Sequence, residues 1–366
     1  MKKTSLLLTP VVLFLFISCT QQNTLSISER VDSLMNTAPD FSGVLLIADQ
    51  GRPVYFKSFG YLDFSTQTKM DTNAVFELAS VSKQFTAMTI MMLQEESKLD
   101  YDDSLKIFFS ELPYPGITIR HLLNHTSGLP DYQSVMDQHW DKSKIAGNED
   151  CVAYLTKYHP PKHFEAGSKY EYSNTGYLLL ASVAEKASGM DFIEFVRQRI
   201  FKKVNMTNTD IRTKEEKLAI PDFAWGHIYV PEKKQFISAD SFPSSNYTIW
   251  LGSRKGPGRI SSTASDLLKW DQALYTTKLV SEKTLVEAFS PATLTNDSTS
   301  NYGFGWMIPK GEEGKTVRHS GDNPGYKTHI IRYIDKNKTI IMLNNNAHAR
   351  FNELLQSLEG ILGQSE

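Results

Sequence analysis

The residues best suited to covalent chemistry are Ser80 and Lys83, which lie three positions apart just ahead of an apolar run at residues 85–93. If a helix begins at or just before Ser80, the two side chains point to the same side. A serine hydroxyl is a useful nucleophile only when a base takes its proton, and a lysine partly removed from water by apolar neighbours can be neutral enough to do so. The apolar run predicts a buried helix, whose N-terminus would hold Ser80 rigidly and direct positive backbone dipole at an oxyanion.

Two further segments carry polar side chains that could complete such a site. Tyr172 and Asn174 are two positions apart in a turn-rich stretch, so both can face one cleft. A nearby cation lowers the pKa of a phenol, which can then serve as acid or base, and an amide can bind a substrate amide and hold a lysine in place. His319 and Ser320 follow in a predicted strand and offer two donors to an anion, and Gly321 permits a ligand to approach the backbone.

The elements that must position these residues follow from the apolar pattern. Residues 43–48 and 54–60 are apolar runs joined by a glycine-containing turn, which predicts a hairpin covered on both faces. Residues 315–319, 327–334 and 339–344 predict strands, and residues 351–362 predict an amphipathic closing helix. We therefore expect an α+β fold of the α/β sandwich type, with an antiparallel sheet built from both chain ends, flanking helices and an inserted, mainly helical subdomain.

Length and composition limit the classes of protein that fit. The 366 residues are 40% hydrophobic and contain no low-complexity linker in their middle, so we expect one hydrolase domain at residues 27–366. Its sheet subdomain would comprise residues 27–99 and about 255–366, and its helical subdomain residues from about 100 to 254. The formal charge is -2 without a basic stripe, which argues against a nucleic-acid partner. We expect a monomer that uses no cofactor and acts on a small molecule or short peptide.

The N-terminal residues have the composition of an export signal. Residues 1–18 combine two lysines, a short apolar stretch and a small residue before Cys19, which is typical of a secretory signal and too short for a membrane span. A cysteine at this point, followed by a polar tether over residues 19–26, resembles a bacterial lipoprotein signal, in which the cysteine is lipidated. The sequence thus predicts an exported cell-envelope protein anchored to the membrane through Cys19. The other cysteine, Cys151, is interpreted as a small buried hydrophobic residue.

The three polar segments, taken together, resemble the serine β-lactamase and penicillin-binding-protein superfamily in its class C-like branch. The matching motifs are Ser80-Val-Ser-Lys83, Tyr172-Ser-Asn174 and His319-Ser-Gly321. Their flanks also match, so the resemblance extends over residues 41–345 and includes Leu122-Leu-Asn-His-Thr-Ser-Gly-Leu129, Gly258-Arg-Ile-Ser-Ser-Thr263 and Tyr302-Gly-Phe-Gly-Trp306. It implies a serine β-lactamase-like fold.

The resemblance also implies roles for individual residues. Ser80 would be acylated, Lys83 would deprotonate it, and Tyr172 would relay the proton to the leaving group and later help to activate water. Asn174 would orient Lys83 and the substrate amide. The backbone N–H groups of Ser80 and Asp322 would form the oxyanion hole. His319 and Ser320, the remaining pair, would bind a carboxylate or steady the tyrosine.

The sequence departs from the superfamily's antibiotic-hydrolysing and cell-wall enzymes at the third motif. His319 stands where those enzymes usually carry lysine, and an imidazole titrates near neutral pH, so we expect the rate to change between pH 5.5 and 8, roughly around the free imidazole pKa. Many relatives with His-x-Gly look like esterases, amidases or peptidases acting on substrates that contain D-amino acids. No Glu-x-x-Leu-Asn follows the second motif, so a class A deacylating glutamate is absent. We therefore expect a serine hydrolase whose main activity is not β-lactam hydrolysis.

Two other functions fit parts of the sequence. A metal hydrolase would use the pairs His121/His125 or His159/His163, each four apart, but Leu122 stands where H-E-x-x-H needs glutamate, and a Pro-Pro pair interrupts the second spacing. No metal is therefore expected, and His125 is expected to cap a loop. The second alternative is a penicillin-binding sensor or binding module that is acylated without efficient turnover. A G-x-S-x-G elbow, the mark of α/β-hydrolases, is absent.

Overall fold

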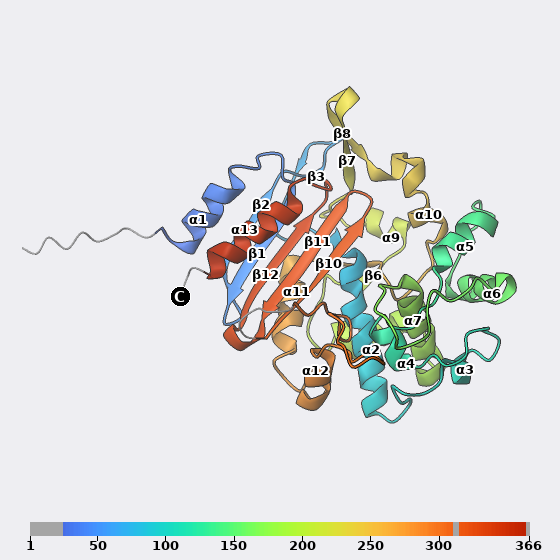
Figure 1. The fold of residues 1–366 in the computed structure, drawn as a ribbon. Coiled ribbons are helices and arrows are strands. Elements are labelled where there is room, and N and C mark those ends of the chain that lie inside the picture. Colours follow the sequence, from blue (N-terminus) through green and yellow to red (C-terminus); the bar gives the residue numbers. More distant parts are fainter. Residues whose placement is uncertain (1–24, 310–314, 364–366) are drawn as a thin grey trace, which may run out of the picture.

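A five-stranded antiparallel sheet forms the centre of the molecule. The computed structural model describes residues 25–309 and 315–363, so the predicted signal segment and Cys19 lie outside the described residues. The strand order is β10-β11-β12-β1-β2, with bounds β1 (Gly43–Asp49), β2 (Arg52–Phe59), β10 (Thr316–Asn323), β11 (Tyr326–Tyr333) and β12 (Lys338–Asn344). Strand β1 pairs with β12, Gly43 opposite Asn344. The expected α+β fold, with its sheet assembled from both chain ends, is therefore confirmed (Figure 1).

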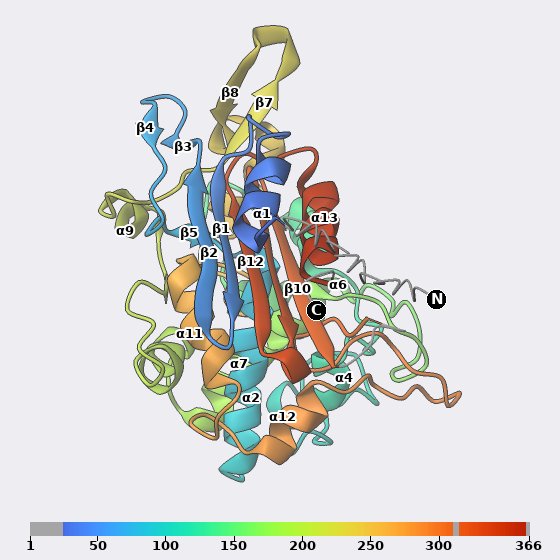
Figure 2. The same ribbon diagram turned by 90° about the vertical axis from the view of Figure 1, so that its left-hand side faces the viewer.

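Helices cover the two faces of this sheet. Helices α1 (Ile27–Met35) and α13 (Phe351–Gly363) lie side by side on one face, and the opposite face packs against α11 (Ala264–Ala273) and α2 (Lys83–Glu95) (Figures 1 and 2). Strand β1 is buried along almost its whole length, as expected. The prediction that β2 is also covered on both faces is wrong. It is an edge strand in which half of the residues are exposed, among them Val54 at 39%.

The middle of the chain forms the expected helical part. Its main helices are α3 (Leu105–Phe108), α4 (Ile119–Leu123), α5 (Tyr132–His139), α6 (Asn148–Tyr158), α7 (Asn174–Ser188), α8 (Phe192–Val196) with the π-helical turn η2 (Arg197–Phe201), α9 (Lys214–Leu218) and α10 (Tyr247–Trp250). Helix α12 (Glu282–Ala288) follows later. Cys151 of α6 is fully buried with its thiol free, as expected for a small apolar residue, and burial raises its pKa to about 12. Among the described residues, no helix is both long enough and apolar enough to span a bilayer.

Short strands and single turns complete the architecture. The strands are β3 (Tyr61–Asp63) with β4 (Thr68–Lys69), the three-stranded set β5 (Phe76–Glu77), β9 (Ile260–Ser262) and β6 (Asp210–Ile211), and the hairpin β7 (His227–Val230) with β8 (Gln235–Ser238). The turns are η1 (Ala79–Ser82), η3 (Pro231–Lys233), η4 (Ala239–Ser241), η5 (Pro243–Ser245) and η6 (Ile334–Lys336). The hairpin, the turns η4 and η5 and helix α10 follow one another between residues 227 and 250.

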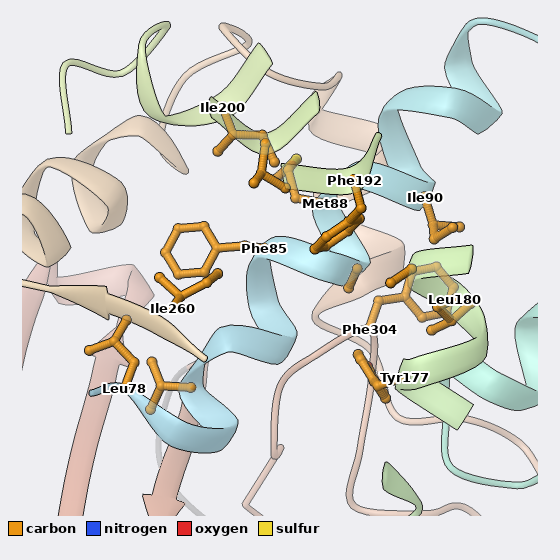
Figure 3. Close-up of a cluster of buried hydrophobic side chains, with 14 of the residues drawn as sticks. Leu78, Phe85, Met88, Ile90, Tyr177, Leu180, Phe192, Ile200, Ile260 and Phe304 are labelled. Carbon is orange, nitrogen blue, oxygen red and sulfur yellow. The ribbon is translucent and has the colours of Figure 1, made fainter. Parts of the chain in front are cut away.

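Helix α2 runs through the largest apolar core and is buried from Lys83 to Leu93. Figure 3 shows Phe85, Met88 and Ile90 packed among side chains of α7, α8, η2 and β9. The Phe85 ring lies 4.4 Å from that of Trp270 in α11. Because this helix is enclosed on every side, the residues at its N-terminus are held in place by the core of the protein.

Candidate active site

A strained turn carries Ser80. Ser80 lies in η1, directly before α2, and Ala79 adopts a positive φ of 48°, which is uncommon for a residue with a side chain. The turn is fixed from two sides, because Leu78 donates its N–H to Ile260 O (2.8 Å) and its carbonyl accepts from the Thr328 hydroxyl (2.8 Å). The partly exposed Ser80 is thus anchored to both β9 and β11.

Lys83 is fully buried one turn beyond Ser80, and its Nζ lies 3.1 Å from Ser80 Oγ. Nζ also donates to Asn174 Oδ1 and to the Pro257 carbonyl, both at 2.8 Å. Burial lowers the pKa of Lys83 well below its usual value, and the positive charge of Arg254 lowers it further. A neutral amine has two N–H donors and one lone pair, so the two carbonyl oxygens use the donors and leave the lone pair for the serine hydroxyl.

Tyr172 lies on the other side of Lys83, with its ring centroid 4.7 Å from Nζ. Its hydroxyl is buried without a hydrogen bond of ordinary length among the described residues. Burial raises the pKa of Tyr172, while the nearby Ser80 hydroxyl lowers it by less. The predicted lowering of this pKa by a neighbouring cation is therefore wrong, because Lys83 is itself shifted towards its neutral form. Tyr172 rests as a phenol that can give up a proton.

The outer edge of β10 carries the N–H of Asp322, which the sequence predicts as the second oxyanion donor. The backbone N–H and C=O of Arg318 both bond to Met307, on the side away from β11. Alternation along the strand places the N–H of Asp322 on that same edge. Gly321 allows the strand to reach η1: a Cβ at this position would lie 2.2 Å from Leu78 O and 3.1 Å from Ala79 Cβ. The glycine thus accommodates the turn that carries Ser80. That it also lets a ligand approach the backbone stays a prediction.

His319 is closed off from any ligand. Its side chain is fully buried, Nδ1 donates to Ser320 O at 2.7 Å, and Nε2 accepts from the Tyr302 hydroxyl at 2.8 Å. Burial lowers the pKa of His319 to about 3, and the neighbouring Lys83 adds to this shift. The prediction that His319 binds a carboxylate is therefore wrong, because both ring nitrogens are occupied and the side chain is buried. The predicted change of rate between pH 5.5 and 8 stays a prediction, and the lowered pKa of His319 argues against it. Ser320 is exposed, with its hydroxyl 2.9 Å from His329 Nδ1.

Three of the four histidines considered as metal ligands have other partners. His121 Nδ1 bonds to Thr118 at the start of α4, and His125 Nδ1 accepts the N–H of Ser173 at 3.1 Å. His125 therefore caps the loop that carries Tyr172, as expected, and its ring centroid lies 4.3 Å from that of Tyr172. His163 pairs with Glu171.

Several residues of the site were not predicted to take part in it. Pro257 holds Lys83 through its carbonyl, and the preceding Gly256 makes this possible, since a Cβ there would lie 2.1 Å from Tyr177 O. Tyr302 fills the space between His319 and Tyr172. Pro257 and Tyr302 lie beside or within segments that match the superfamily, so these segments could have predicted that the two residues belong to the site. Arg254 carries no such signal.

Comparisons with known proteins agree with this geometry. A family described as Beta-lactamase matches residues 31–358. A penicillin-binding protein of Bacillus subtilis (strain 168) is 42% identical over 309 residues, which cover 83% of this chain and 68% of that protein. A D-aminopeptidase of Gluconobacter oxydans (strain 621H) is 22% identical over 334 residues, 91% of this chain and 61% of that protein. The octameric penicillin-binding protein homologue from Pyrococcus abyssi shares the fold, with a TM-score of 0.78 at 24% identity, covering 92% of this chain and 77% of that one.

The neutral burial of His319 predicts a specific acid sensitivity. Between pH 5.5 and 4 the unfolded imidazole is protonated and the folded one, with its pKa of about 3, is not. Stability is therefore present above pH 6.5 and is lost as the pH falls towards 3. Replacing His319→Gln should reduce the slope of unfolding free energy against pH by about 1.4 kcal/mol per pH unit in this range, the contribution of one proton. Urea unfolding at four pH values measures it. The exposed His139→Gln variant is the control, and equal slopes for wild type and His319→Gln would contradict the assignment.

The contact between β10 and η1 predicts that Gly321→Ala impairs catalysis. The added methyl group must push β10 away from Leu78, which shifts the adjoining N–H of Asp322, the proposed second oxyanion donor. We expect kcat to fall about 10²- to 10³-fold, as when one oxyanion donor is lost. Ester hydrolysis at saturating substrate measures it. Gly360→Ala is a matched control, because its Cβ would meet nothing within 4 Å. Unchanged kcat in a folded Gly321→Ala protein would exclude the proposed placement of β10.

Proposed function

Because the chain belongs to the Beta-lactamase family, we propose that it forms an acyl-enzyme at Ser80 and cleaves amides or esters. Its similarity to a penicillin-binding protein and to a D-aminopeptidase supports a serine hydrolase. The observation that carries this proposal is the contact set of Lys83, a buried amine placed against one hydroxyl and two carbonyl oxygens. We propose peptides, amides or esters containing D-amino acids as substrates. The similarity to a D-aminopeptidase supports that choice, and the neutral His319 in place of a lysine supports a main activity other than β-lactam hydrolysis.

The proposed reaction follows from the resting protonation of the site. Lys83 takes the proton of Ser80 as Oγ attacks the substrate carbonyl, and the resulting oxyanion accepts hydrogen bonds from the N–H groups of Ser80 and Asp322. Tyr172 gives its proton to the leaving group and recovers one from the Lys83 ammonium. Water then attacks the acyl group by the same proton transfers in reverse. Asn174 keeps Lys83 aligned through its side-chain oxygen.

Acylation without turnover is the second candidate, because a penicillin-binding protein is among the relatives. Ser80, Lys83, Tyr172 and Asn174 are all present and all in one place, which favours turnover over a sensor. The two functions differ in the fate of the acyl-enzyme: a sensor releases one equivalent of product and stalls.

Covalent labelling tests the proposed nucleophile. A fluorophosphonate should modify Ser80 in wild type and in the exposed control Ser65→Ala, and peptide mass should locate the adduct. Ser80→Ala should lower turnover of nitrophenyl esters by at least about 10⁴-fold. Comparing D-amino-acid amides, D-alanyl-D-alanine peptides, nitrophenyl esters and a chromogenic cephalosporin then ranks the substrates. Wild-type turnover by Ser80→Ala would rule out the mechanism, and a burst that stalls on every substrate would replace the hydrolase with a sensor.

We further propose that the protein is exported and held at a membrane by a lipid on Cys19. The support is the sequence of residues 1–18 and the polar tether that follows. Metabolic labelling with an alkyne fatty acid should mark wild type and Cys151→Ser, the matched control in the only other cysteine, but leave Cys19→Ser unlabelled. Labelling of Cys19→Ser at the wild-type level would refute the anchor.

A further inference from the structure

Arg254 is a buried cation without an acidic partner. Its side chain is only 8% exposed, and its side-chain hydrogen bond runs from Nη1 to the Tyr132 hydroxyl at 3.0 Å. The groups that act on its charge are Tyr132, Tyr247 and Cys151, none of which is a carboxylate. Among the described residues, no Asp or Glu lies within ion-pair distance of its guanidinium. Burying a charge without a counter-ion costs several kcal/mol of folding free energy. Binding of an anionic ligand by Arg254 would account for its place in the fold.

Two neighbouring cavities meet at this residue. One of about 240 Å³ and one of about 310 Å³ are both lined by Arg254 and Arg259, and the second also by Arg212. The side chains of Arg259 and Arg212 bond to oxygens of residues 208, 212 and 261 and, like Arg254, form no ion pair in the described parts of the chain. The nearby acid Glu77 is already paired with Lys217. Three other acids line the cavities: Asp240 is paired with Lys214, and Glu215 and Glu216 form no ion pair with these arginines among the residues that the structure describes. Among the arginines, Arg254 is the one whose charge is balanced by no carboxylate of the described residues.

The first cavity is lined by residues close to the proposed catalytic centre, and the charge of Arg254 acts on Lys83. Asn323, one residue after Asp322, lines it, and Pro257, whose carbonyl holds Lys83, follows Arg254 by three residues. None of the aromatic residues around Tyr172 lines either cavity. In the proposed mechanism Tyr172 serves the leaving group, which leaves these two cavities for the acyl group.

We propose that the cavity at Arg254 and Arg259 binds a carboxylate carried by the acyl portion of the substrate, so that the preferred acyl groups are monoanionic. This inference rests on the proposed function, since it assigns the acyl specificity of the same Ser80 centre. A guanidinium is suited to the task because its planar fork donates two parallel hydrogen bonds to a carboxylate. The substrate thereby supplies the counter-ion that the folded chain lacks.

A pair of esters that differ only in that charge tests the proposal. The 4-nitrophenyl monoester of glutaric acid carries a terminal carboxylate, and 4-nitrophenyl methyl glutarate is its neutral counterpart. We expect wild type to prefer the anionic ester about 10- to 100-fold in kcat/KM, and Arg254→Met to lose at least tenfold of that ratio. Lys255→Met is the matched control, because this adjacent cation is already paired with Glu185 and Asp191, and it should keep the wild-type ratio. No preference in wild type, or an equal ratio in Arg254→Met, overturns the proposal.

A second measurement needs no turnover and separates the two proposals. Monomethyl glutarate at 10 mM should raise the thermal midpoint of Ser80→Ala protein and of its Lys255→Met derivative, but not of its Arg254→Met derivative. No shift in Ser80→Ala protein also overturns the carboxylate site. If wild type hydrolyses neither ester while the midpoint shift follows Arg254, the hydrolase proposal fails and the anion site stands.

Discussion

Removing the Lys83 amine from water is the constraint on which the rest of the site depends. A lysine in an apolar core either loses its proton or requires compensating partners, and here its three contacts come from η1, α7 and the loop before β9. One nitrogen therefore fixes the relative positions of three segments that are far apart in the chain. The enclosed helix α2 supplies the rigidity that makes this fixation effective.

The same burial acts on the neighbouring titratable groups in a consistent direction. It lowers the pKa of His125 and His319 and raises that of Tyr172, so each of these side chains rests uncharged. Charge thus develops in this pocket mainly while a reaction proceeds, when preorganised N–H groups and dipoles interact with it most strongly. Arg254 is the exception, and its lasting charge biases Lys83 towards the free amine.

Local patterns in the sequence predicted more of the fold than of the site. Apolar runs located the strands at both chain ends and the buried helix after Lys83, because an element enclosed by the core is apolar on every face. The exposed face of β2 was missed, since strand order cannot be read from one strand's composition. His319 was recognised as a motif residue, but its burial depends on Tyr302 and on the fold around it. The sequence could not identify Arg254, because what distinguishes this residue is that no carboxylate of the described residues lies near its buried guanidinium in the folded protein.

The pairing of β1 with β12 has a consequence for how the chain acquires its structure. Asn344 donates to the carbonyl of Ser42, 302 positions earlier, and the Asp322 donor lies just before those last strands. We expect this pairing to form slowly and late in folding, because the chain must lose the conformational entropy of the long loop before the strand contacts can stabilise it. A chain that still lacks residues 316–344 has Ser80 but neither the sheet centre nor the completed pocket. The proposed catalytic site is therefore assembled only when β10, β11 and β12 join the sheet.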